Sequence, residues 1–161
     1  MKAPRLLPKE LFVKKLVFAN KTSVRDVASS LREFISRNYN GIVDFSPFGL
    51  DNRFILVEDY ELAIMIRSVI KEFTLKHICT ISFLVENDDF IISFKAHEDS
   101  PPSENAITHL RGQAQRYGLS STSDGLSFGI VIPTHKFSSC PIYNKDRLKF
   151  YDALFSVFSE Q

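Results

Sequence analysis

The strongest constraint on the fold is a pair of apolar runs in the middle of the chain. Residues 78–85 and 90–94 are rich in Ile, Phe and Val, and the polar residues 86–89 separate them. Two runs of this kind around a short polar segment are typical of antiparallel strands joined by a tight turn. The sequence therefore predicts a β-hairpin, which needs an apolar layer against at least one of its faces.

Helical segments can supply that layer. In residues 24–38 and 59–73 apolar side chains recur every three or four positions, which indicates amphipathic helices. Both segments begin near residue types that cap helix N-termini, namely Asn20, Thr22 and Ser23 for the first and Asp59 for the second. A third helix is expected at residues 104–117, between a Ser-Pro-Pro-Ser break and Gly118.

Further short strands complete a layered fold. The composition predicts strands near residues 11–18, 42–45 and 54–57, and a second hairpin made of residues 119–123 and 128–132. Asp124 and Gly125 are expected to form the turn of this hairpin, and Pro133 to end it. The order predicts an α/β two-layer sandwich, in which three helices cover one face of a mixed, mostly antiparallel sheet.

The C-terminal segment predicts an additional helix at residues 146–158. Its apolar residues fall on one helical face, and they are Leu148, Tyr151, Leu154, Phe155 and Phe158. Both a core-covering role and a surface for a partner protein fit this density of aromatic residues.

Length and charge limit the class of protein. A chain of 161 residues with 44% hydrophobic content fits a single domain spanning residues 1–161. The 20 basic and 19 acidic side chains leave a net charge of +1, so no strong field attracts nucleic acid. We expect no nucleic-acid partner.

Cysteines and apolar runs indicate the environment. Cys79 and Cys140 are too few for a disulfide scaffold and lack zinc-site spacing, which predicts reduced thiols and a cytoplasmic location. Charged residues interrupt the N-terminal apolar stretch, and no other run approaches the length of a membrane span. We expect no direct membrane insertion, although the sequence also fits the cytoplasmic end of a longer sensor.

Three stretches carry a resemblance to one known family. They are TSVRDVASSLREFI at 22–35, RFILVEDYELAIMIRSVIKEF at 53–73, and AQRYG, LSSTSDGLSF and GIVIP within 114–133. Together they resemble, over about residues 16–133, the histidine-kinase-like ATPase (GHKL or Bergerat) domain of bacterial sensor histidine kinases. The second stretch is similar to the family's N-box helix, and the third to its final helix, Gly turn, hairpin and terminal Pro. Residues 134–161 are then a C-terminal extension with a helix.

The resemblance implies nucleotide-binding positions on the N-box helix. Two asparagines of the family fall at Ser68 and Glu72, and the later position holds Mg²⁺ in the family. Glu72 is therefore the implied metal ligand, since carboxylate oxygen suits a hard cation. Lys71 and Lys76 are implied as phosphate contacts.

The segment after the first hairpin departs from the family. There the family places an adenine-reading Asp and two glycines, whereas residues 95–102 contain no glycine. His97 and Asp99 are the residues implied to contact nucleotide in this segment. The glycine-rich ATP lid is also missing, because Pro102 runs almost directly into the helix beginning near Glu104. These departures predict that no cofactor binds tightly.

His97 has other interpretations. With Glu98 and Pro102 it fits the H-E-x-x-x-P pattern of a kinase phosphoacceptor, but that motif works on an exposed helix, which Pro101 and Pro102 oppose. With Glu98 and Asp99 it would form a metal site only if the three side chains converged. A plain polar loop is the interpretation favoured by the sequence.

The leading functional hypothesis is a degenerate ATPase-like module in two-component signalling. It would act by protein contact, with a response regulator, a kinase or a second copy as partner, and without ATP turnover. One alternative is a working ATP- and Mg²⁺-binding catalytic domain of a histidine kinase, in which Glu72 replaces the metal-binding asparagine. A second alternative is an unrelated α/β domain that binds a small ligand.

Overall fold

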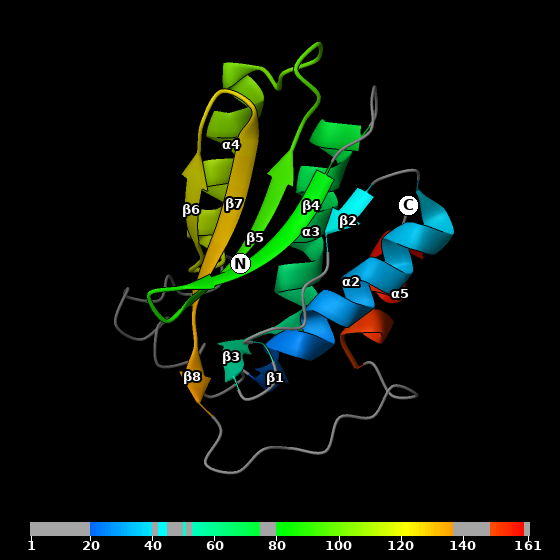
Figure 1. The fold of residues 1–161 in the computed structure, drawn as a ribbon, viewed down its shortest axis with the longest axis vertical. Coiled ribbons are helices and arrows are strands. Elements are labelled where there is room, and N and C mark those ends of the chain that lie inside the picture. Colours follow the sequence, from blue (N-terminus) through cyan, green and yellow to red (C-terminus); the bar gives the residue numbers. More distant parts are fainter. Residues whose placement is uncertain are drawn as a thin grey trace, which may run out of the picture.

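The structure is a computed structural model of the chain, and it describes residues 20–39, 42–44, 50, 53–74, 80–136 and 149–159. Within these residues it contains four helices and two sheets (Figure 1). The elements are β1 (Asn20–Ser23), α2 (Val24–Asn38), β2 (Ile42–Asp44), β3 (Arg53–Val57), α3 (Asp59–Thr74), β4 (Thr80–Glu86), β5 (Asp89–Lys95), α4 (Glu104–Arg116), β6 (Ser120–Ser123), β7 (Ser127–Pro133), β8 (His135–Lys136) and α5 (Lys149–Ser159).

The larger sheet has five strands in the order β2-β4-β5-β7-β6. Strand β2 runs parallel to β4, and every other neighbouring pair is antiparallel. Figure 1 shows α3 and α4 behind this sheet, so the helices form the second layer. The prediction of a two-layer α/β sandwich with a mixed, mostly antiparallel sheet is confirmed.

Alternation along the strands determines which face of the sheet is buried. Phe90, Ile92 and Phe94 of β5 are fully buried, and they pair across the ladder with Ile132, Ile130 and Phe128 of β7. Because side chains alternate between faces along a strand, these residues all point into the same layer. That layer is the apolar core shared with the helices.

The central hairpin forms as the sequence predicts. Strands β4 and β5 pair from Thr80↔Lys95 to Glu86↔Asp89, which leaves Asn87 and Asp88 as a two-residue loop. Both loop residues have positive φ, 52° and 65°, as a type I′ turn requires. Asn and Asp tolerate this conformation better than other non-glycine residues, which explains the choice of turn residues. The start of the predicted first run, residues 78 and 79, lies outside the described residues.

A second, three-stranded sheet was not predicted. It has the order β1-β3-β8, with both pairs antiparallel. Pro133 ends β7, but the chain continues through Thr134 into β8 and so passes from one sheet to the other. The expectation of one sheet is therefore incomplete. The sequence does not predict β8, because this strand has only two residues and no apolar periodicity. The strand expected near residues 11–18 lies outside the described residues.

Thr134 links the two sheets through hydrogen bonds. Its hydroxyl donates to the Asp88 carbonyl oxygen at 2.6 Å and accepts from the Arg53 guanidinium at 2.8 Å. The same guanidinium lies 3.0 Å from the Asp88 carboxylate. Arg53 belongs to the small sheet and Asp88 to the hairpin of the large one, so these contacts fix their relative position.

The helix ends largely follow the predicted caps. Ser23 caps α2, and its Oγ accepts from the Asp26 backbone N–H at 3.4 Å. The N-cap predicted for α3 was Asp59, but the structure places Glu58 there. The Glu58 carboxylate accepts from the backbone N–H groups of Tyr60 and Glu61 at 3.2 and 2.8 Å. Asp59 is instead the first helical residue and accepts from the hydroxyl of Thr22 at 2.7 Å.

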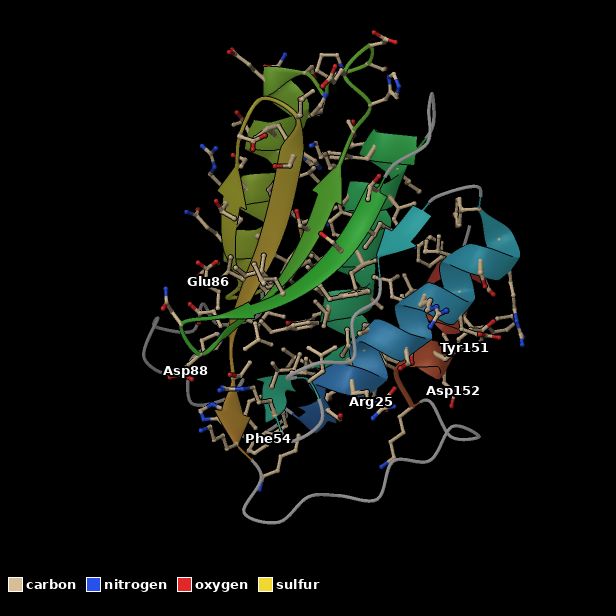
Figure 2. The ribbon with its side chains drawn as sticks, in the orientation of Figure 1. Arg25, Phe54, Glu86, Asp88, Tyr151 and Asp152 are labelled. Carbon is tan, nitrogen blue, oxygen red and sulfur yellow. The ribbon has the colours of Figure 1, made fainter. Side chains whose placement is uncertain are left out.

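The predicted additional helix is α5, which packs on α2 and α3. Its residues Phe150, Ala153, Leu154 and Val157 are buried. Burying each large apolar side chain is worth roughly 1.5–3 kcal/mol. The core-covering role is thus confirmed, but the predicted face is correct only in part: Leu154 is buried and Tyr151 and Phe158 pack against the core, whereas Phe155 is 60% exposed. Leu148 lies outside the described residues. Figure 2 shows Arg25 of α2 beside Tyr151 and Asp152 of α5, where the two helices lie together.

Candidate functional site

The predicted residues on α3 lie near its C-terminal end. Ser68 is half-buried, and its hydroxyl donates to the Ile64 carbonyl oxygen of the preceding turn at 3.0 Å. Lys71 and Glu72 are exposed on the last turn of the helix. Lys76 lies outside the described residues. The Ser68 hydroxyl is therefore engaged by its own helix, whereas the two charged side chains reach solvent.

The loop after β5 is organised by its own polar groups. The Asp99 backbone N–H donates to His97 Nδ1 at 3.2 Å, and the Asp99 carboxylate lies 3.4 Å from the same nitrogen. The Ser100 backbone N–H donates to the His97 carbonyl oxygen at 3.0 Å. Both the His97 and the Asp99 side chains are mostly exposed, at 57% and 84%. This is a compact surface turn.

This geometry decides between the interpretations of His97. A phosphoacceptor histidine lies on an exposed helix, whereas His97 lies in the turn between β5 and α4. The phosphoacceptor interpretation of His97 therefore does not fit the structure. In the part of the chain that the structure describes, no three His, Cys, Asp or Glu side chains come together as a metal-binding group. The side chains of residues 97–99 therefore do not converge on a cation site. Among the described residues, Glu72 is likewise not part of a group of three such side chains.

Helix α4 starts soon after this loop. Only residues 96–103 connect β5 to α4, and Ser103 caps the helix by accepting from the Ala106 backbone N–H at 3.1 Å. Ala96 is buried, and its N–H donates to the Leu126 carbonyl oxygen at 2.8 Å. The connection is thus anchored at both of its ends and is too short to form a long lid over a ligand.

A surface depression lies beside the N-terminal half of α4, next to the end of this loop. Its volume is about 540 Å³, and it is lined by Pro102, Glu104, Ile107, Thr108, Arg111, Asp124 and Gly125. Of the residues predicted to bind nucleotide, the five that the structure describes, Ser68, Lys71, Glu72, His97 and Asp99, do not line it. No local sequence pattern marks this grouping, because its members come from the loop before α4, from α4 itself and from the β6–β7 turn.

The charges in this depression are held in place. The Arg111 guanidinium donates to the Ser123 hydroxyl at 2.9 Å. Asp124 accepts from the backbone N–H groups of Leu126 and Ser127, each at 2.8 Å. These bonds, the Leu126 one first, lower the pKa of the Asp124 carboxyl below its ordinary value. The depression therefore combines the fixed cation of Arg111 with the fixed carboxylate of Asp124, and Glu104 adds a second carboxylate to its lining.

Comparison with known proteins assigns no family. No protein-family model matches the chain, and no curated protein matches it. The histidine-kinase-like interpretation therefore rests on the residue pattern. Among the residues that the structure describes, none of the helices combines the length and apolar character needed to cross a bilayer.

Proposed function

We propose that this chain is a degenerate histidine-kinase ATPase-like module that signals in the cytoplasm by contacting another protein, without ATP turnover. The order of its elements supports the proposal. A strand and helix are followed by two short strands, a long helix, a hairpin, a further helix and a final hairpin, as the resemblance implies. The fold-determining apolar pattern is kept, so the difference from an active domain lies in the polar residues.

The main support for the proposal is the composition and the local hydrogen bonding of the segment between β5 and α4. It contains no glycine that would let the backbone approach a nucleotide, and the His97 ring accepts from the Asp99 backbone N–H within a local turn. Helix α4 follows at once, capped by its own Ser103. On α3 the Ser68 hydroxyl is used within the helix. A site for ATP would need a lid and a cradle that these residues do not supply.

Exposed apolar side chains support contact with a protein. Leu84 on the large sheet is 51% exposed, and Phe155 on α5 is 60% exposed. Large apolar residues on the surface favour association, and the near-neutral net charge of +1 does not oppose it. A response regulator, a kinase or a second copy of this chain is the class of partner that the resemblance implies.

Thermal unfolding in the presence of ATP and Mg²⁺ tests the proposal. A ligand that binds only the folded state raises the melting temperature, and the rise grows with ligand concentration. We expect no rise at millimolar nucleotide. A clear rise that depends on Mg²⁺ would support the working ATP-binding domain instead. In that case Glu72→Ala should remove the rise, while the control variant Glu33→Ala, at a solvent-accessible glutamate of α2, should keep it.

A further inference from the structure

The face of the large sheet that points away from the helices has a regular pattern. On β5 this face carries Asp89, Ile91, Ser93 and Lys95, because the residues between them are buried in the core. The ladder places Leu84 and Val131 on either side of Ile91. These three residues form one row of large apolar side chains across β4, β5 and β7, which we call the large row.

A second row lies beside the large row on the same face, two residues away along each strand. Ser82, Ser93 and Gly129 are cross-strand neighbours with short or absent side chains, and Thr122 of β6 continues their row. A Cβ atom added at Gly129 would lie 2.9 Å from Thr122 Cγ2 and 3.3 Å from Ile91 Cγ2, so these two methyl groups fill the space over the glycine and bury it. We call Ser82, Ser93 and Gly129 the small row. Ser82 and Ser93 are partly exposed and have short side chains, so larger side chains of a partner can lie against them.

Opposite charges mark the two ends of the same face. Glu86 and Asp89 pair at the hairpin end, where Figure 2 shows Glu86, and Lys95 lies at the other end of β5. Asp124 lies close enough to Lys95 to feel its charge, but the Asp124 carboxylate is bonded to the N–H groups of its own turn. The face thus has an acidic end and a basic end, with apolar and small residues between.

We propose that two copies of this chain associate through this face, with their sheets packed face to face and their strands antiparallel. The two-fold axis lies between the two sheets, runs perpendicular to the strands and crosses β5 midway between Ile91 and Ser93. It places Lys95 of each copy opposite Asp89 of the other. The same axis places each large row on the other copy's small row. Charge and shape complementarity therefore select the same arrangement, and self-complementary surfaces of this kind are typical of two-fold dimers.

This inference rests on the protein contact of the proposed function and names its partner, a second copy of the chain, and its surface. It does not depend on the loss of ATP binding. Nucleotide binding would overturn the proposed function and leave the dimer untouched. A monomeric chain would overturn the dimer and leave the nucleotide result untouched. The two failures are therefore distinguishable.

Sedimentation of the full chain up to about 100 μM tests the association, since dimers of micromolar affinity populate there. We expect a dimer, and Leu84→Glu should weaken it by about a hundredfold or more, because it sets a charge against the small row. Phe155→Glu, on the exposed side of α5, is the matched control and should leave the dimer intact. A monomer at every concentration overturns the inference, as does a dimer that Leu84→Glu does not weaken.

Charge reversal tests the orientation of the two copies. Lys95→Asp and Asp89→Lys should each weaken the dimer by about tenfold, because each contact occurs twice in a two-fold dimer. The double variant should regain most of the affinity, since it restores opposite charges across the axis. Additive losses in the double variant would overturn this arrangement. A monomeric wild type whose melting temperature falls in Leu84→Glu would mean that the chain covers this face itself, which also overturns the proposal.

Discussion

The carboxylate of Asp26 on α2 lies 3.3 Å from the backbone nitrogen of Phe150 on α5, 124 residues later in the chain. It also accepts from the Lys149 N–H at 3.2 Å, and the Ser30 hydroxyl donates to it at 2.9 Å. The first N–H groups of a helix have no partner within that helix. Asp26 supplies one from another helix, so it docks α5 by capping its N-terminus.

Replacing Asp26 tests this docking. Asp26→Ala leaves the N–H groups of Lys149 and Phe150 without their carboxylate, and it should lower the free energy of unfolding by about 2 kcal/mol. Urea denaturation followed by circular dichroism measures the loss. Glu33→Ala is the control on the same helix, because the exposed pair of Glu33 with Arg37 should be worth less than about 0.5 kcal/mol. Equal losses in the two variants would contradict the docking role.

The other end of α5 is held by α3. The Arg67 guanidinium donates to the Val157 carbonyl oxygen at 2.8 Å, and this carbonyl belongs to the last turn of α5. Arg67→Met keeps most of the side-chain bulk but removes the donor, and should cost about 1 kcal/mol of unfolding free energy. The exposed Arg116 of α4 gives the matched Arg→Met control. If Arg116→Met costs as much as Arg67→Met, the contact with α5 is not the cause.

Thr134 should be needed for the junction of the two sheets. Thr134→Val keeps the side-chain shape and the backbone N–H bond to Asp88 but loses the hydroxyl bonds to Arg53 and Asp88, and should lower the unfolding free energy by about 1–2 kcal/mol. Hydrogen exchange should then become faster in β3 and β8 than in the central hairpin. Thr108→Val, on the exposed surface of α4, should have little effect. Uniform exchange across both sheets would contradict the role of Thr134.

The stability of the fold should depend on the charge state of Asp59. Burial raises the pKa of the Asp59 carboxyl, and the charges of Asp26 and Glu58 raise it further, while the hydrogen bond from Thr22 lowers it only in part. Because the folded-state pKa is above the unfolded one, Asp59 favours the fold below its unfolded pKa. This contribution is lost as the pH rises through the folded pKa.

Asp59→Asn should remove that dependence. Its unfolding free energy relative to wild type should increase as the pH is raised from about 3 to about 7, since the amide keeps the Thr22 bond without titrating. Parallel urea titrations of both proteins across this range measure the difference. A difference that stays constant or falls with increasing pH would contradict the assigned direction.

Local patterns made most of the fold predictable. Helix α2 spans the predicted residues 24–38 because its periodicity and its Ser23 cap agree, and Gly118 ends the third helix with a positive φ of 71°. The turn at Asn87 and Asp88 is likewise encoded by neighbouring residues. These features depend on contacts between residues close in sequence.

The remaining features depend on distant partners. The capping of α5 by Asp26 and the link from Arg53 to Thr134 join residues far apart in the chain, and no local pattern signals them. For the site, the sequence supplied candidate positions but not their geometry. Ser68 proved to be bonded within α3, and His97 Nδ1 to the Asp99 backbone N–H. Both contacts are local, but the residue types alone do not select them.

The most direct test of the central claim is a calorimetric titration of the full chain with a slowly hydrolysed ATP analogue and Mg²⁺. The account predicts no binding heat up to millimolar nucleotide, because the segment from β5 to α4 offers neither cradle nor lid. Metal-dependent binding at micromolar affinity, which corresponds to about −8 kcal/mol, would contradict it. Loss of that binding in Glu72→Ala would then identify a working ATP site on α3.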